Sequence, residues 1–461
     1  MHLLTITTHN FINKIVSFAY MKNILIIGAG RSSSSLIKYL LAHSNEESWN
    51  VTVGDVSMDL VKQKIDNHPN ARAIIFDVNN QAQREEEIKN ADIVISMLPP
   101  SMHINVAKDC VKFKTHLATA SYVSKEMAEL DAVAKDAGVI LMNEMGLDPG
   151  IDHASAMQVI DKIHEEGGTL TSFKSYCGGL VAPESNDNPW GYKFSWNPRN
   201  VVLAGQGTAK FIENGNYKYL PYNRLFTQIE QIEVDDLGRF DGYANRDSLS
   251  YRKLYSIENI PTMLRGTLRN IGYCNAWNVL VKLGLTDDSY TIASSNNLTY
   301  RELLEAFLPE GKETIKQKLI DFMGEEMSSE DLAKIEWLGI FEDRKITLND
   351  ATPAQILQQV LEEKWKLKAH DKDMIVMQHQ FEYVIAGKPN KLTSSLIVKG
   401  EDQMYTAMAK TVGLPLAIVT KLILQNKIQS RGVILPVTKD IYIPLLTELA
   451  NLDIKFEEKK S

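Results

Sequence analysis

Between residues 23 and 143, short apolar runs alternate with segments that have the period of amphipathic helices, and this alternation constrains the fold more than any other feature. Runs this short and nearly continuous suit parallel strands that are buried on both faces. The runs are NILIIG, NVTVGD, RAIIFDV, DIVISML, THLATA and VILMNEM. Six strands separated by five crossover helices predict an α/β fold with a doubly wound, Rossmann-type parallel sheet.

The composition changes after residue 143, which predicts further domains. Residues 151–167 are predicted to form one amphipathic helix, and residues 170–260 combine strand patterns with many Gly, Pro, Tyr and Trp residues. Helical patterns dominate residues 299–368, strand patterns return at 373–398, and an apolar helix is predicted at 401–425. The predicted divisions are an extension outside the core at 1–20, a Rossmann dinucleotide-binding domain at 21–145, a second α/β domain at 146–298 and 369–400, a small helical insertion at 299–368, and a C-terminal segment at 401–461 that packs back on the core.

Charge and composition exclude several classes of protein. The formal net charge of −8 argues against a broad electrostatic surface for nucleic acid. The three cysteines, Cys110, Cys177 and Cys274, are too few and too scattered for a disulfide framework or a four-cysteine zinc site, so no metal is predicted and a reducing cytoplasm is favoured. No continuous apolar run reaches the length of about 18 residues that a membrane span needs.

A glycine-rich turn follows the first predicted strand. In Gly28-Ala29-Gly30 the first glycine permits a tight turn, and the second lets the backbone approach a pyrophosphate at the start of the next helix. Ser33 replaces the third glycine of the usual pattern. The turn predicts a dinucleotide site, and the alternative is a Rossmann-like domain without a cofactor.

The acidic residue at the end of the second predicted strand bears on the choice of cofactor. Asp55 can accept hydrogen bonds from ribose hydroxyls and would repel a 2′-phosphate. The next residue is Val56 and not an arginine, so charge favours NAD over NADP. The alternative is that Asp55 only caps the following helix, although Ser57 or Asp59 could do so instead.

Polar residues also collect where the later parallel strands end, which is where open α/β sheets bind ligands. The most unusual of these ends contains Asp148-Pro149-Gly150. Asp148 either caps the helix that follows or presents its carboxylate at the crevice between domains. His153 lies about one turn inside that helix, where a single histidine is more often packed than catalytic.

The second α/β domain holds three polar clusters, at residues 175–199, 243–248 and 265–269. Arginines in such loops can hold carboxylates through paired, charge-assisted hydrogen bonds, and the alternative is that they form surface ion pairs. Cys177 has no obvious histidine partner and is predicted to be a packed thiol.

Six segments together resemble the saccharopine dehydrogenases of the L-glutamate-forming kind, also called saccharopine reductases. They are TASY at 119–122, MNEMGLDPGIDH at 142–153, SYCGGLVAPES at 175–185, DNPWGYKFSW at 187–196, YANRDS at 243–248 and RGTLR at 265–269. The resemblance is dense from about 116 to 275, thinner from 21 to 115 and from 276 to 461, and leaves residues 1–20 outside. It implies that saccharopine is interconverted with L-glutamate and 2-aminoadipate 6-semialdehyde through an imine, with a nicotinamide cofactor. It also implies that the second domain binds substrate and forms a homodimer.

The resemblance assigns contacts to particular residues. The implied cofactor contacts are Gly28, Ala29, Gly30, Arg31, Ser32, Asp55, Asp77, Val78, Leu98, Thr119, Ala120, Gly146, Leu147 and Asp148. The implied substrate contacts are Ala120, Ser121, Asp148, Arg246, Thr267, Leu268 and Arg269. NADP-using relatives carry Cys-Arg-Thr where this chain has Asp55-Val56-Ser57, which favours NAD-linked oxidation of saccharopine in lysine degradation and leaves NADP as the alternative cofactor.

The chemistry requires anchors for the substrate carboxylates and groups that move protons. Arg246 and Arg269 are the predicted anchors. The candidates for proton transfer are Asp148, Tyr122, His153 and Lys193, which the sequence does not rank, and bound water could suffice. Two other functions stay open: a related imine reductase such as carboxynorspermidine dehydrogenase, which would need fewer carboxylate anchors, and a catalytically inactive nucleotide sensor.

Overall fold

A computed structural model describes residues 21–460, so the predicted extension at 1–20 lies outside the described residues. The apolar runs form six parallel strands: β1 (Lys22–Ile27), β2 (Trp49–Asp55), β3 (Ala71–Ile75), β4 (Ile93–Ser96), β5 (His116–Thr119) and β6 (Ile140–Met142). They belong to one sheet in the order β15-β6-β5-β4-β1-β2-β3. The predicted Rossmann fold is confirmed, and its switch point lies between β1 and β4.

The prediction of six strands was wrong by one. The seventh, β15 (Gly432–Ile434), comes from the C-terminal segment and pairs in parallel with β6. Three residues are too few to produce a recognisable strand pattern, so only pairing with β6 defines this strand.

Both faces of this sheet are buried. Alternate side chains of a strand point to opposite faces, and on each face they join an apolar cluster. Ile24 and Ile26 join one apolar cluster, while Leu25 and Ile27 join another. The helices that follow the first strands are α1 (Ser34–His43), α2 (Met58–Ile65), α3 (Gln81–Lys89), α4 (His103–Phe113), α5 (Lys125–Ala128) and α6 (Asp131–Ala137). The last two both lie between β5 and β6, where the alternation predicted one crossover helix.

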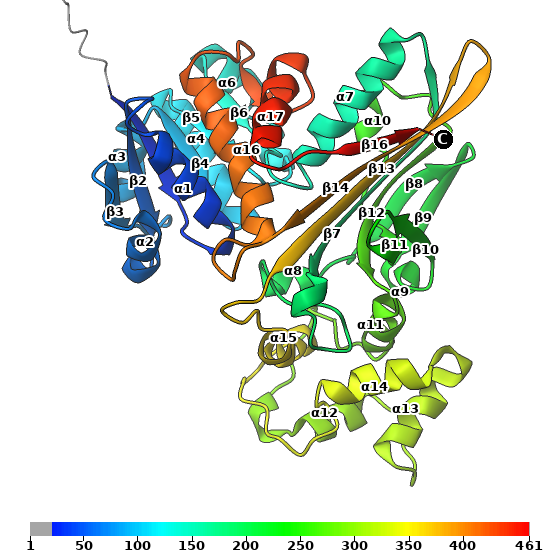
Figure 1. Cartoon of the computed structure of the whole chain (residues 1–461). Helices are drawn as coiled ribbons and strands as arrows, with labels where there is room; N and C mark the ends of the chain where they lie inside the picture. Colours follow the sequence, from blue (N-terminus) through cyan, green and yellow to red (C-terminus); the bar gives the residue numbers. More distant parts are fainter. Residues whose placement is uncertain (1–20, 461) are drawn as a thin grey trace, which may run out of the picture.

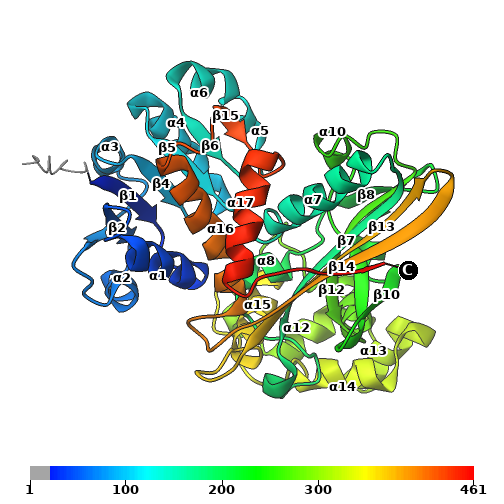
Figure 2. The ribbon, with the colours of Figure 1, turned by 45° about the horizontal axis from the view of Figure 1, so that its top comes forward.

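The C-terminal segment packs against this domain through α16 (Ala407–Leu424) and α17 (Lys439–Asn451). Helix α16 lies beside α1, and α17 lies beside α7 (Ile151–Glu165), as Figures 1 and 2 show. Among the described helices, α16 alone is long and apolar enough to cross a membrane, but 78% of that stretch is buried inside the protein.

The second sheet is mixed and has nine strands. They are β7 (Thr169–Val181), β8 (Thr208–Glu213), β9 (Asn216–Pro221), β10 (Ile229–Val234), β11 (Gly238–Ala244), β12 (Thr262–Asn270), β13 (Asp373–Ile385), β14 (Lys388–Lys399) and β16 (Glu457–Lys460). The central strands β12 and β7 are parallel, and β13 pairs antiparallel with β7. Because β16 pairs with β14, the C-terminal segment adds a strand to each sheet.

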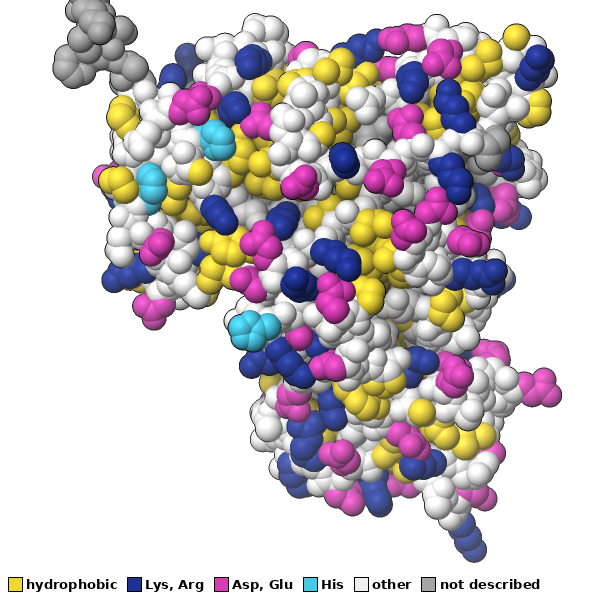
Figure 3. Space-filling model, viewed as in Figure 1, with side chains coloured by type: hydrophobic (Ala, Val, Ile, Leu, Met, Phe, Trp, Pro, Cys, Tyr) yellow, Lys and Arg dark blue, Asp and Glu magenta, His cyan; other side chains and the backbone are white. Residues whose placement is uncertain are grey.

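A group of helices lies at one end of the second sheet (Figure 1). The remaining helices are α8 (Pro198–Val202), α9 (Tyr222–Leu225), α10 (Tyr251–Leu254), α11 (Tyr273–Lys282), α12 (Tyr300–Ala306), α13 (Ile315–Met323), α14 (Ser329–Trp337) and α15 (Pro353–Lys364). The 3₁₀ helices are η1 (Arg31–Ser33), η2 (Pro100–Met102), η3 (Pro183–Ser185), η4 (Ser295–Asn297) and η5 (Gly324–Glu326). Capping boxes at Ser328 and Thr352 start α14 and α15. On the face shown in Figure 3, acidic and basic side chains are interspersed.

Candidate active site

The glycine-rich turn has the geometry of a dinucleotide cradle. Gly28 has a φ of +106°, and a Cβ there would meet the carbonyl oxygen of Met97 at 3.0 Å. A Cβ on Gly30 would meet nothing within 4 Å, so open space adjoins the backbone at the point where a pyrophosphate would approach. The residues present therefore fit a dinucleotide.

Asp55 is tied to this turn. Its Oδ2 accepts a hydrogen bond from the Ala29 amide at 2.7 Å, and its Oδ1 accepts one from the Ser57 amide at 2.9 Å. The alternative that Asp55 caps α2 is wrong, because the Ser57 side chain caps that helix by accepting from the Leu60 amide. Val56 is 74% exposed and reaches into solvent.

Sequence reasoning missed a cation beside the same turn. Lys64, near the end of α2, donates to the Ser33 hydroxyl at 2.9 Å and to the Gly30 carbonyl. Burial lowers the pKa of Lys64 to about 8, and the charge of Asp55 opposes this shift. Lys64 reaches the turn only because α2 packs beside it, so no pattern in the sequence indicated this contact.

The other predicted cofactor contacts lie along the carboxyl edge of the parallel sheet. Arg31 Nη1 donates to the carbonyls of Phe194 and Trp196, at 3.4 and 3.5 Å, and so links the turn to the second domain. A Cβ on Gly146 would meet Ala120 Cβ at 2.9 Å, which brings the ends of β5 and β6 into close contact. The remaining contacts follow or end strands of this sheet: Ser32 after β1, Asp77 and Val78 after β3, Leu98 after β4, Thr119 in β5, and Leu147 after β6.

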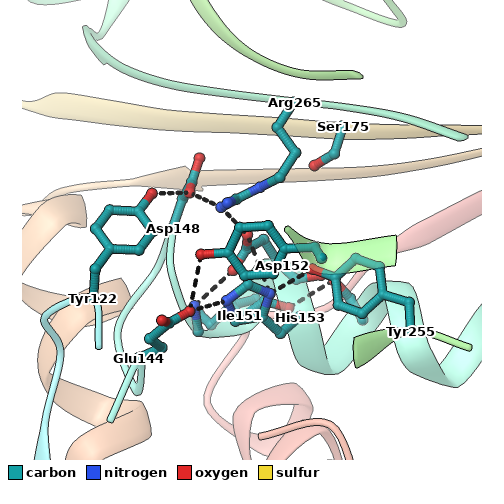
Figure 4. A network of polar contacts seen from close by, with 12 residues as sticks. Tyr122, Glu144, Asp148, Ile151, Asp152, His153, Ser175, Tyr255 and Arg265 are labelled. Carbon is teal, nitrogen blue, oxygen red and sulfur yellow. Dashed lines mark hydrogen bonds and ion pairs between the residues drawn. The ribbon is translucent and has the colours of Figure 1, made fainter. Parts of the chain in front are cut away.

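A buried ion network lies between these strand ends and the second sheet (Figure 4). Asp148 Oδ1 accepts from Arg265 Nη2 at 2.5 Å and from the Tyr122 hydroxyl at 3.2 Å. Arg265 Nη2 also donates to Asp152 Oδ2 at 2.7 Å. The alternative that Asp148 caps α7 is wrong: it is Asp152 that accepts from the Gly150 amide, and Asp148 contacts Arg265 of the second sheet.

A second layer of polar groups lies behind this network. His153 is fully buried, with Nε2 2.8 Å from Glu144 Oε2 and Nδ1 2.5 Å from the Tyr255 hydroxyl. Glu144 also accepts from the Val123 amide at 3.0 Å and from the Tyr251 hydroxyl at 3.2 Å. Sequence reasoning missed the roles of Glu144, Asp152, Tyr251, Tyr255 and Arg265. The available signals were a glutamate inside the apolar run VILMNEM and the place of Arg265 in the polar cluster at 265–269.

The two aspartates of the network differ in their electrostatics. Burial raises the pKa of Asp148, although the charge of Arg265 opposes the shift. Burial also acts to raise the pKa of Asp152, but His153 and Arg265 outweigh it, so this pKa lies below its usual range. Burial and the charge of Asp148 hold the pKa of Tyr122 well above its ordinary value. Asp152 therefore serves as the counter-charge, while Asp148 is suited to exchange a proton.

The two predicted anchors present guanidinium groups near aromatic rings. Arg246 lies 5.0 Å from the ring of Tyr122. Arg269, on β12, is buried between Tyr192 and Tyr273, and donates to the carbonyl of Leu268. Within the described residues its Nε has no hydrogen-bond partner and it forms no ion pair. Arg269 is thus a buried cation able to receive a carboxylate, not part of a surface ion pair.

The neighbouring predicted contacts on β12 are less accessible. The Leu268 side chain is fully buried in a small apolar cluster, so only its backbone could meet a substrate. Thr267 pairs in the sheet with Tyr243 of β11 and with Cys177 of β7. Cys177 is buried, and burial raises the pKa of its thiol, which agrees with a packed thiol.

Lys193 is placed apart from the other proton-transfer candidates. Its buried Nζ lies 2.7 Å from both Asp187 Oδ1 and Asp371 Oδ2. Within the part of the chain that the structure describes, it makes no polar contact with Asp148, Tyr122 or His153. The structure therefore brings together three of the four candidates.

The fold and the site together define a class. A Rossmann domain with a dinucleotide cradle, facing a second sheet that carries buried arginines, is the architecture of two-domain nicotinamide-dependent dehydrogenases. Two family models match the chain: the saccharopine dehydrogenase NADP binding domain at residues 24–142, and the saccharopine dehydrogenase C-terminal domain at residues 146–454. The chain belongs to the saccharopine dehydrogenase family, as the sequence resemblance implied.

Curated relatives match nearly the whole chain. The saccharopine dehydrogenase [NADP(+), L-glutamate-forming] of Schizosaccharomyces pombe is 35% identical, over 95% of this chain and 99% of its own length. The Saccharomyces cerevisiae protein of the same name is 36% identical, over 93% and 96%. The mouse mitochondrial alpha-aminoadipic semialdehyde synthase is 34% identical, over 97% of this chain and 48% of its own.

A solved structure agrees with these matches. The apo saccharopine dehydrogenase (L-Glu forming) of Saccharomyces cerevisiae has a TM-score of 0.86 and 36% identity, covering 95% of this chain and 100% of that one. A homospermidine synthase from Legionella pneumophila, in complex with NAD, has a TM-score of 0.57 at 9% identity, which shows a shared fold alone.

Proposed function

We propose that this protein interconverts saccharopine with L-glutamate and 2-aminoadipate 6-semialdehyde, using a nicotinamide dinucleotide. The observation that carries the proposal is the identity of 35–36%, over nearly the full length, to enzymes named for this activity. The site supports it, because the buried Arg269 can receive a substrate carboxylate, and Asp148, held by Tyr122 and Arg265, can exchange a proton.

A bound nicotinamide supplies the acceptor or donor of hydride. In the oxidative direction the secondary amine of saccharopine loses a hydride and a proton and becomes an imine. Water then adds, and the C–N bond breaks to give L-glutamate and the semialdehyde. Asp148 accepts the proton of the amine and returns a proton when the C–N bond breaks. Tyr122 holds the Asp148 carboxylate in place, and the charge of Arg265 favours its ionised form. Arg246 and Arg269 hold substrate carboxylates.

The activity is tested by mixing purified protein with saccharopine and either NAD or NADP, following absorbance at 340 nm and measuring the glutamate formed. Carboxynorspermidine is the parallel substrate. We expect glutamate to appear with saccharopine. Tight nucleotide binding without turnover of either substrate would support the nucleotide sensor instead, and turnover of carboxynorspermidine alone would support the other imine reductase.

For the cofactor, we propose that NAD is preferred over NADP, although the yeast relatives are named for NADP(+). Asp55 lies at the end of β2 beside the turn, and the exposed Val56 offers no guanidinium to a 2′-phosphate. An NAD-linked enzyme suits the oxidation of saccharopine in lysine degradation. A cytoplasmic location and a homodimer stay predictions.

We expect Asp55→Ala to weaken NAD binding and to improve NADP binding, because it removes ribose acceptors and a like charge whose repulsion costs several kcal/mol. Adding Val56→Arg should shift preference further towards NADP. The measurement is the ratio of kcat/KM with NADP and NAD, which should rise at least about tenfold in Asp55→Ala. A wild-type preference for NADP that is lost in Lys64→Met would contradict the proposal and identify Lys64 as the group that reads the phosphate.

We expect Arg269→Leu and Arg246→Leu to weaken saccharopine binding by about 1.5–3 kcal/mol each, the usual worth of a hydrogen bond to a charged group. This corresponds to a rise in KM of roughly tenfold to 150-fold. Cofactor affinity, measured by fluorescence titration without substrate, should hardly change. Loss of cofactor binding with normal saccharopine affinity would show that the anchors are wrongly assigned.

A further inference from the structure

A buried histidine joins the ends of two strands beside the proposed substrate site. His103 is the first residue of α4, is 4% exposed, and has its Nδ1 2.8 Å from the hydroxyl of Ser96 at the end of β4. Its Nε2 lies 2.8 Å from the hydroxyl of Ser121, which follows β5. Ser121 is one of the substrate contacts that the family resemblance implies. His103 has no assigned role in the proposed reaction.

The hydrogen-bond partners define which nitrogen of His103 carries the proton. Burial lowers the pKa of His103 to about 4, so the ring is neutral near pH 7, with one donor nitrogen and one acceptor nitrogen. The Ser96 hydroxyl is buried, and within the described residues His103 Nδ1 is its one hydrogen-bond partner. Because this hydroxyl is buried it needs that partner, and it can donate to Nδ1 when the ring hydrogen is on Nε2.

The other side of the ring agrees with this assignment. Both the Ser121 hydroxyl, at 2.8 Å, and the Thr119 hydroxyl, at 3.3 Å, lie against Nε2. One nitrogen lone pair cannot accept from two hydroxyls, but one N–H can be shared between two oxygens. Nε2 therefore carries the hydrogen and donates it to Ser121 Oγ. The hydroxyl hydrogen of Ser121 is then free to be donated elsewhere.

We propose that His103 is a positioning residue that, through Ser121, makes this site selective for a substrate carboxylate. By donating to Ser121 Oγ, His103 leaves Ser121 with a hydrogen to give, which suits a carboxylate oxygen and not an ammonium group. The opposite tautomer would leave Ser121 with only lone pairs to present. The proposal rests on the proposed function, because it takes saccharopine as the substrate.

The test compares His103→Leu, His103→Gln and Ser121→Ala in the full chain. Removing one hydrogen bond to a charged group should raise the KM for saccharopine about tenfold in His103→Leu and in Ser121→Ala, with kcat and cofactor affinity changed much less. The double variant should be no worse than Ser121→Ala, because His103 acts through Ser121. His103→Gln, whose amide N–H can replace Nε2–H, should recover most of the affinity.

A matched control is His116→Leu, since His116 is another largely buried histidine, whose Nδ1 accepts from the Ile140 amide away from Ser121. It should leave KM unchanged. If His103→Leu raised KM equally in wild type and in Ser121→Ala, or if His116→Leu matched it, the effect would be a general loss of structure and the proposal would fall.

Nitrogen-15 NMR of the ring reads the tautomer without substrate or activity. We expect the signature of a neutral imidazole protonated on Nε2, changing to a mixture in Ser96→Ala. A ring protonated on Nδ1 in the wild type would overturn the proposal even if saccharopine is turned over. An Nε2-protonated ring in a protein that neither binds nor turns over saccharopine would instead reject the proposed function, and with it the carboxylate as the group that Ser121 receives.

Discussion

Replacing Arg265 with methionine is expected to destabilise the protein by about 3–5 kcal/mol, the range for breaking a buried ion pair from one side. The guanidinium is almost fully buried and contacts both Asp148 and Asp152, so among the described residues its loss leaves Asp148 without a cation and Asp152 with His153 alone. The measurement is the free energy of unfolding in urea at pH 7. Activity should be lost as well.

A matched control for this prediction is Arg252→Met. Arg252 lies on α10 and donates to the Glu258 carbonyl and the Tyr217 hydroxyl, both at exposed positions, so its loss should cost no more than about 0.5 kcal/mol. The loss in Arg265→Met should also shrink as the pH falls. Burial already raises the pKa of Asp148, and without the opposing charge of Arg265 this shift is larger in the folded state, so protonation favours folding and the penalty is greatest above that pKa. An Arg265→Met protein as stable as the wild type at pH 7 would contradict the network.

The second large effect is expected from Asp148→Asn, which should lower kcat by about 10²–10⁴-fold, the usual contribution of a general acid–base group. Asparagine has nearly the same shape and can still accept from Tyr122 and Arg265, but it cannot take a proton. Asp187→Asn is the control, because Asp187 is a partly exposed carboxylate that pairs with Lys193 and Lys368 away from the network.

The pH profile gives a separate test of Asp148. Burial raises its pKa, and only the ionised carboxylate accepts a proton, so kcat/KM should fall as the pH falls through a value above the ordinary aspartate pKa of about 3.9. This acid limb should disappear in Asp148→Asn. A loss in kcat below about tenfold, or an unchanged acid limb, would assign the proton transfer to bound water.

Much of the fold could be predicted because the relevant patterns are local. Strands buried on both faces produce apolar runs such as NILIIG. Helix starts are also local, because Ser328 and Thr352 each form a capping box with the residue three positions later. The dinucleotide turn could be predicted for the same reason, since Gly28 and Gly30 act within a few residues of each other. The three-residue strand β15 could not, because its pairing partner β6 lies almost 300 residues earlier.

The candidate site was predicted only in part. The sequence pattern identified Asp148, Tyr122 and His153 as candidates for proton transfer, and it left helix capping as the other role of Asp148. It did not identify Arg265 as the partner of Asp148, nor Glu144 as the partner of His153, and it grouped Lys193 with residues that it does not contact. Arg265 meets Asp148 only because the second sheet packs against the strand ends of the first, and Lys193 is held elsewhere by Asp187 and Asp371.

The sequence by itself determined the α/β class of this protein, the glycine-rich turn and the family to which it belongs, because periodicity and short motifs are set by neighbours along the chain. Only the tertiary structure decided the protonation and pairing of the site. The pKa of Asp148, the cation beside Asp55 and the tautomer of His103 depend on burial and on charges brought from distant segments. Electrostatic interactions act through space and strengthen where water is excluded, so no local pattern of residues records them.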